Sequence, residues 1–82
     1  MSERRIPAKE QVVREMFRGR EMYGQYASTH EAVAVIREEY LEFEREVFHG
    51  TPEAAVKEAV QLAATAMRFV MEFGNGERAA TR

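Results

Sequence analysis

Hydrophobic residues recur along this chain at steps of three and four, which is the period of an amphipathic helix. Together with helix start and stop signals, these steps predict three helices and a tail, at about residues 7–27, 29–48, 52–73 and 77–82. Ser28 and Glu31 form a capping box before the second helix, and Thr51 followed by Pro52 starts the third. The pattern leaves no interdomain linker, so we expect a single all-α domain over residues 1–82.

The second and third helices are separated by about three residues, so they must fold back as an antiparallel hairpin. The second helix carries one apolar stripe, made of Val33, Ile36, Tyr40, Phe43 and Val47. The third is polar over about 100° of arc and apolar elsewhere. A helix of that kind has to be covered on more than one side. We therefore expect the hairpin to complete a four-helix core with another copy, as a homodimer or homotetramer.

Composition narrows the possible classes of protein. The 82 residues are 45% hydrophobic and 32% charged, as in ordinary globular proteins, and the net charge of −2 argues against nucleic-acid binding. The absence of Cys excludes disulfides and thiolate metal sites. No apolar run is long enough to span a membrane, and no signal peptide is expected, so a cytoplasmic location is the expectation.

Four glutamates form the most informative cluster: Glu38, Glu39 and Glu42 on the second helix, and Glu58 on the third. Glu39 and Glu42 are three residues apart and share a helix face, while the hairpin brings Glu42 level with Glu58. Carboxylates that converge repel each other unless a cation is present, and an all-oxygen site suits Mg²⁺ or Mn²⁺. The alternative is that these residues are solvated surface glutamates, as most such pairs on charged helices are.

The glutamates also follow a recognisable spacing. Residues 38–42 read EExxE, and after fifteen residues Glu58 begins an ExxQ segment that ends at Gln61. On two antiparallel helices, this pattern resembles the EExxE…ExxD signature of the MazG-like all-α NTP pyrophosphohydrolases, over about residues 30–73. The resemblance implies Mg²⁺-dependent hydrolysis of a nucleoside triphosphate to the monophosphate and pyrophosphate.

The resemblance also implies roles for individual residues. Glu39, Glu42 and Glu58 would be metal ligands, and Glu38 a further ligand or a base that orients water. Gln61 stands where the family has Asp. An amide oxygen still coordinates a metal, but it brings no negative charge.

Two basic residues of the third helix are candidates for contact with phosphate. Lys57 and Arg68 lie on the same polar arc as Glu58, from which they could reach phosphate oxygens; the alternative is an ordinary solvated position.

Two functional classes stay open. The first class is a pyrophosphohydrolase whose nucleotide substrate binds near these side chains and Gln61. The second is a degenerate MazG-like helical module that binds nucleotide or a protein partner without hydrolysis.

Overall fold

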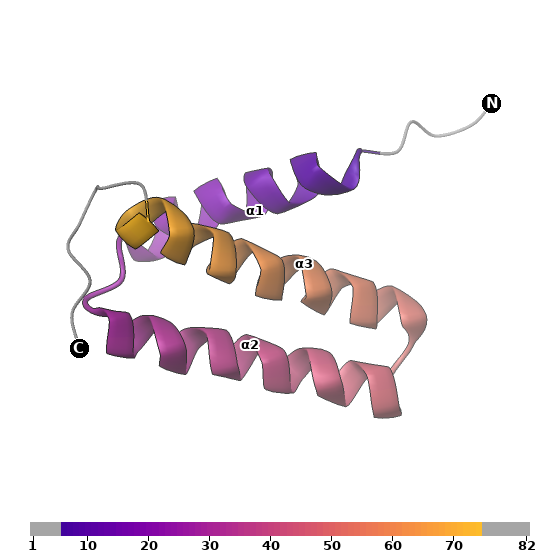
Figure 1. The fold of residues 1–82 in the computed structure, drawn as a ribbon. Coiled ribbons are helices and arrows are strands. Elements are labelled where there is room, and N and C mark those ends of the chain that lie inside the picture. Colours follow the sequence, from indigo (N-terminus) through magenta and orange to yellow (C-terminus); the bar gives the residue numbers. More distant parts are fainter. Residues whose placement is uncertain (1–5, 75–82) are drawn as a thin grey trace.

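A computed structural model describes residues 6–74 as three helices (Figure 1). In chain order the elements are α1 (Ala8–Tyr23), α2 (Thr29–His49), α3 (Pro52–Phe69) and a short π-helical stretch that extends α3 (Val70–Gly74). The prediction of an all-α fold with three helices is confirmed. The tail predicted at 77–82 lies outside the described residues.

Side-chain caps explain where α2 and α3 begin. Ser28 Oγ accepts a hydrogen bond of 3.1 Å from the Glu31 N–H, and Thr51 Oγ1 accepts one of 3.1 Å from the Ala54 N–H. Pro52 occupies the first turn of α3, where its missing N–H costs no intrahelical hydrogen bond. The short connection folds α2 and α3 into the predicted antiparallel hairpin (Figure 1).

The prediction for the end of the first helix was wrong. It was placed at about residue 27, but α1 ends at Tyr23. Gly24 adopts φ +75°, a conformation that ends the helix at little cost for glycine, and its N–H still bonds the Arg20 carbonyl at 2.8 Å. Tyr26, which matched the helical period, instead turns into the interior. Its hydroxyl donates to the Thr65 carbonyl at 2.9 Å.

α3 is the central element of the fold. It packs against both α1 and α2, whereas α1 and α2 have no close backbone contact with each other within residues 6–74 (Figure 1). The polar side of α3 faces its neighbours; Arg68 is buried there, as is Glu72 in the π-helical stretch that extends α3. The hydrophobic side faces outward, where Val56 of α3 and Val70 of the π-helical stretch are exposed.

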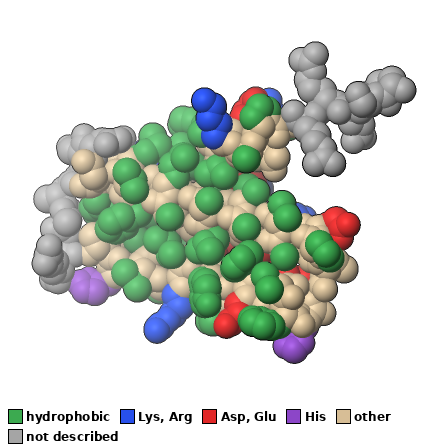
Figure 2. Space-filling view, turned by 45° about the vertical axis from the view of Figure 1, so that its right-hand side comes forward, with side chains coloured by type: hydrophobic (Ala, Val, Ile, Leu, Met, Phe, Trp, Pro, Cys, Tyr) green, Lys and Arg blue, Asp and Glu red, His purple; other side chains and the backbone are tan. Residues whose placement is uncertain are grey.

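The apolar stripe of α2 is divided in a similar way. Ile36 and Phe43 are half-buried, but Val33, Tyr40 and Val47 are exposed, so the stripe does not enter the interior as one unit. In the described part of the chain, the buried hydrophobic residues are Met16, Tyr26, Ala32 and Ala64. Much of the hairpin's apolar surface therefore lies on an outer face (Figure 2).

Candidate metal centre

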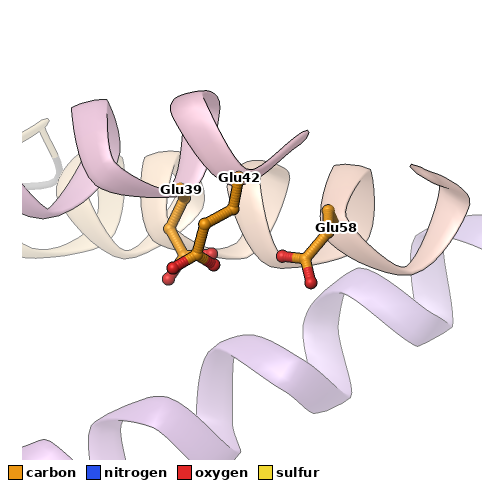
Figure 3. A group of neighbouring side chains, drawn as sticks. All are labelled: Glu39, Glu42 and Glu58. Carbon is orange, nitrogen blue, oxygen red and sulfur yellow. The ribbon is translucent and has the colours of Figure 1, made fainter. Parts of the chain in front are cut away.

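Glu39, Glu42 and Glu58 come together between α2 and α3 (Figure 3). One carboxylate oxygen from each residue lies within 4.8 Å of one carboxylate oxygen from each of the other two. Glu39 and Glu42 project from one side of α2, and Glu58 reaches them from α3 (Figure 3). All three side chains are half-buried. The convergence predicted from their spacing is confirmed, and we call these three residues the glutamate group.

Burial and mutual repulsion make the glutamate group hard to ionise. Burial is the main cause that raises the pKa of Glu39, and the charges of Glu42 and Glu58 raise it further. Burial likewise raises the pKa of Glu58 first, followed by the charge of Glu42 and a hydrogen bond with it. Each ionised carboxylate is therefore destabilised by the charges of the others. A bound cation stabilises such a group most, because it offsets this repulsion.

The donor set suits a hard divalent cation. Mg²⁺ and Mn²⁺ favour carboxylate oxygens, and about 2.0–2.1 Å from an octahedral Mg²⁺ such oxygens are about 3 to 4 Å apart. Oxygens already within 4.8 Å reach that spacing by small rotations of flexible Glu side chains. Three protein ligands leave further octahedral positions for water or phosphate oxygens.

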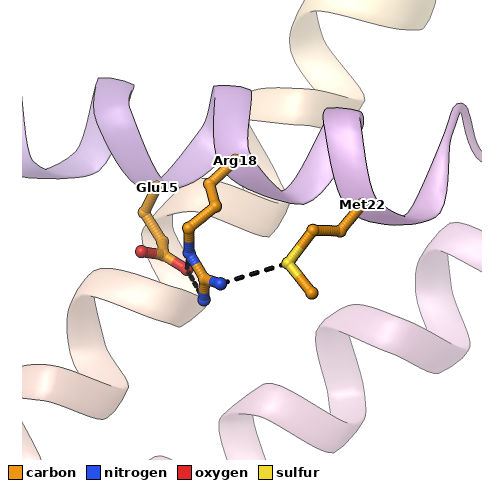
Figure 4. Close-up of polar contacts among 3 residues, drawn as sticks. All are labelled: Glu15, Arg18 and Met22. Atoms are coloured by element: carbon orange, nitrogen blue, oxygen red, sulfur yellow. Dashed lines mark hydrogen bonds and ion pairs between the residues drawn. The ribbon is translucent and has the colours of Figure 1, made fainter.

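A cavity of about 130 Å³ lies beside the glutamate group, between the three helices. Glu39 and Gln61 are in its wall, and α1 adds Glu15 and Arg18. Arg18 Nη2 holds a Glu15 carboxylate oxygen at 2.7 Å, and Arg18 Nη1 also donates to the Met22 sulfur at 3.1 Å (Figure 4). These contacts hold the positively charged Arg18 guanidinium at the cavity wall, within reach of a molecule bound in the cavity.

A second, larger groove of about 510 Å³ shares Tyr23, Glu39 and Arg68, among others, with this cavity. Tyr26 and Glu38 line the groove but not the cavity. Glu38 is exposed and lies outside the glutamate group, although its charge contributes to the raised pKa of Glu39. The structure therefore places Glu38 beside the three predicted ligands.

Arg68, predicted to contact phosphate, is buried. Its Nη2 donates to the Gly24 carbonyl at 2.7 Å, and its guanidinium carbon lies 4.2 Å from the centre of the Tyr26 ring. Its Nε is buried without a hydrogen-bond partner, and the side chain passes close to Gly19. Arg68 thus holds the α1–α2 loop on α3 while it lines both the cavity and the groove.

The other two predicted substrate-binding residues differ in their surroundings. Lys57 is exposed on a separate groove of about 410 Å³; its charge adds to the lowering of the pKa of Glu15 and partly offsets the rise in the pKa of Glu58. Gln61 is half-buried, lines both this groove and the 130 Å³ cavity, and contributes to lowering the pKa of the Glu15 carboxyl. Gln61 therefore lies close to the glutamate group, whereas Lys57 lies at its periphery.

Sequence reasoning missed the contribution of α1 to this site. Glu15 and Arg18 are a helical i, i+3 pair, a pattern common on solvated surfaces. Gly19 was the available signal, since a glycine within a helix often marks the close approach of another group, here Arg68.

Comparisons of the chain with protein-family models, with curated proteins and with solved structures found no match. None of the helices within residues 6–74 combines the length and apolar character needed to cross a membrane.

The raised pKa values of Glu39 and Glu58 lead to a prediction for the metal-free protein. A carboxyl with a higher pKa in the folded than in the unfolded chain destabilises the fold when ionised, and this cost is relieved as the pH falls through the raised pKa. We expect the Tm in EDTA to rise as the pH is lowered from 7 to about 5. Glu15, whose pKa is lowered by Arg18, acts in the opposite direction at more acidic pH.

Thermal unfolding in EDTA and in saturating Mn²⁺ measures this effect. With Mn²⁺ the rise in Tm should disappear, because protons then compete with the cation for the same oxygens. A Tm that falls steadily from pH 7 to about 5 in EDTA would contradict the prediction.

Proposed function

We propose that the glutamate group binds Mg²⁺ or Mn²⁺ and that the protein hydrolyses nucleoside triphosphates to the monophosphate and pyrophosphate. The observation that carries this proposal is the convergence of three carboxylates from α2 and α3 beside a cavity whose lining includes charged side chains. The EExxE spacing of residues 38–42, followed by Glu58, supports membership of the MazG-like superfamily. The expected assignment is a metal-dependent hydrolase.

The chain's own residues have distinct tasks in this proposal. A bound cation supplies charge neutralisation for phosphate oxygens. Arg18 places a second positive charge on the cavity wall, where it can hold a phosphate oxygen that the cation does not contact. Glu38 presents an exposed carboxylate to the adjoining groove, where it can orient a water molecule toward the substrate.

A pyrophosphate-release assay tests the activity directly. The protein is incubated with a panel of ribo- and deoxyribonucleoside triphosphates in Mg²⁺ or in Mn²⁺. We expect release of pyrophosphate with a subset of the panel and none in EDTA. No release from folded protein that binds Mn²⁺ would reject the hydrolase and favour the second candidate.

The second candidate function is a helical module that binds nucleotide or a protein partner without hydrolysis. Gln61 is the observation that favours it, because Gln61 stands where the family has Asp. A neutral amide leaves the site one negative charge short of the family's pattern. Fewer anionic ligands weaken the binding of a hard cation.

Replacing Gln61 separates the metal site from an ordinary acidic surface. We expect Gln61→Asp to tighten Mn²⁺ binding by about tenfold or more, because a charge about 4 Å from a divalent ion interacts by several kcal/mol at an effective dielectric of 20 before desolvation is subtracted. Any pyrophosphatase rate should rise as well. Isothermal titration of Mn²⁺ into both proteins measures the difference.

Gln11→Asp is the matched control, since the same change is made at an exposed position of α1. It should leave Mn²⁺ affinity unchanged. Equal and negligible binding by wild type and Gln61→Asp would mean that the glutamate group does not bind metal.

A further inference from the structure

α1 brings a further carboxylate, that of Glu15, to the cavity beside the glutamate group. Glu15 lines the 130 Å³ cavity together with Glu39 and Gln61. Its side chain is only 18% exposed, whereas that of Glu10, which forms the comparable ion pair with Arg14 on α1, is 45% exposed. Glu15 is therefore an acidic residue of α1 that faces the other helices rather than solvent.

Electrostatic effects across the cavity connect Glu15 with both of the other helices. Burial is the main cause of the raised pKa of Glu39 on α2, and the charge of Glu15 is one of those that raise it further. The hydrogen bond from Arg18 is the main cause that lowers the pKa of Glu15, and Gln61 on α3 contributes. Glu15 therefore keeps its negative charge close to the glutamate group.

Arg18 orients the Glu15 carboxylate. Its Nη2 and Nε donate to the same oxygen, Oε2, at 2.7 Å and 3.1 Å. The other oxygen of Glu15 is turned away from Arg18 (Figure 4). Carboxylates that bind metals are commonly hydrogen-bonded in turn, and this second contact fixes their orientation. Glu15 thus has one oxygen held by Arg18 and one that Arg18 leaves for another partner, as a ligand that binds through a single oxygen requires.

Arg68 gives an independent sign that the cavity receives a ligand. It lines the same cavity, its side chain is buried with 5% of the residue exposed, and its Nε is buried without a hydrogen-bond partner. A buried N–H without an acceptor is unfavourable, and a guanidinium donates most strongly to anionic oxygens. A cavity of this size has room for several water molecules. Its wall therefore offers carboxylates to a cation and an N–H group to a phosphate oxygen bound with it.

We propose that Glu15 is a fourth ligand of the cation held by the glutamate group, contributed by α1. Three glutamates leave octahedral positions open, and Glu15 takes one of them through the oxygen that Arg18 does not hold. Glu15 lies outside the set of oxygens within 4.8 Å of one another, so its flexible side chain has to rotate toward the cation. The Arg18 side chain is 57% exposed and can follow it. This inference rests on the metal binding in the proposed function, but not on hydrolysis.

The first test is isothermal titration of Mn²⁺ into single variants. Glu15→Gln keeps the shape of the side chain and removes its charge, so it should weaken Mn²⁺ binding by about tenfold or more, because the number of charged ligands sets the affinity for a hard cation. Glu10→Gln is the matched control. It removes the same charge from α1 at a carboxylate outside the cavity, and Mn²⁺ affinity should change by less than about twofold because solvent and salt screen exposed charges.

The outcomes of this titration separate the fourth ligand from the metal centre itself. Wild type that binds Mn²⁺, with unchanged affinity in Glu15→Gln, would overturn the role of Glu15 and leave the glutamate group as the site. Wild type that binds no Mn²⁺ would reject the role of Glu15 together with the metal binding in the proposed function.

The second test distinguishes a ligand from a charge that acts at a distance. Glu15→Ala removes the ligating oxygens, so Mn²⁺ bound at saturation should carry one more water molecule than in wild type. Broadening of the Mn²⁺ EPR lines in ¹⁷O-enriched water counts these molecules. Glu10→Ala should carry the wild-type number. Alanine favours a helix, so circular dichroism should show the wild-type helical content for both variants. An equal number of waters in Glu15→Ala and wild type would overturn the proposal.

Discussion

Glu42→Gln should reduce Mn²⁺ affinity by more than about 100-fold and abolish any metal-dependent pyrophosphate release, since loss of even an indirect partner of a metal ligand costs about 10–100-fold. Glu42 raises the pKa of both Glu39 and Glu58, so it is the residue whose charge both of the others feel. The substitution keeps the shape of the side chain and removes only its charge. Isothermal titration of Mn²⁺ measures the loss.

The same variant should have the opposite effect on the metal-free protein. Removing the charge of Glu42 relieves repulsion on Glu39 and Glu58, so the Tm in EDTA at pH 7 should rise. Glu44→Gln is the control, because Glu44 lies on α2 outside the glutamate group and should change neither quantity. Unchanged Mn²⁺ affinity in Glu42→Gln would show that the cation does not bind at these carboxylates.

Tyr26→Ala should cost about 3–5 kcal/mol of unfolding free energy, the range for truncating a buried aromatic side chain. Tyr26 is 2% exposed, its ring lies under the Arg68 guanidinium, and its hydroxyl donates a hydrogen bond to the Thr65 carbonyl. Truncation removes all of these contacts between the α1–α2 loop and α3. A loss of this size is a large part of the stability of a small domain. Urea unfolding at one protein concentration measures it.

Two further tyrosine variants separate the contributions. Tyr26→Phe removes only the hydrogen bond to Thr65 and should cost about 1 kcal/mol. Tyr23→Ala truncates a side chain that is 74% exposed and should change stability by less than about 0.5 kcal/mol. A Tyr26→Ala protein as stable as Tyr23→Ala would mean that the loop is not held by this residue.

Local signals explain how far the sequence alone predicts this fold. The starts of α2 and α3 depend on Ser28 and Thr51, whose hydroxyls cap the adjacent helix whatever the rest of the chain does. The glutamate group was predictable for a similar reason. A short turn determines which residues of a hairpin lie level, so Glu42 and Glu58 could be paired without knowledge of α1.

Long-range contacts account for what the sequence does not predict. Tyr26 fits the helical period of α1, but its N–H donates at 3.0 Å to Glu72, a residue 46 positions away. Periodicity likewise identifies the polar side of α3 but does not say that this side is the one buried. Arg68 is accommodated there by the Gly24 carbonyl and the Tyr26 ring, and both belong to the loop that periodicity had assigned to a helix.

The attachment of α1 along a single seam has a consequence for motion. α1 packs against α3 and has no close backbone contact with α2 in the described part of the chain. A helix held along one seam can open at a lower free energy than global unfolding requires. Glu15 and Arg18 would move away with it, and the wall they give to the 130 Å³ cavity would open. Opening of α1 would therefore expose Glu39 and Gln61, while the α2–α3 hairpin that aligns the glutamate group stays closed.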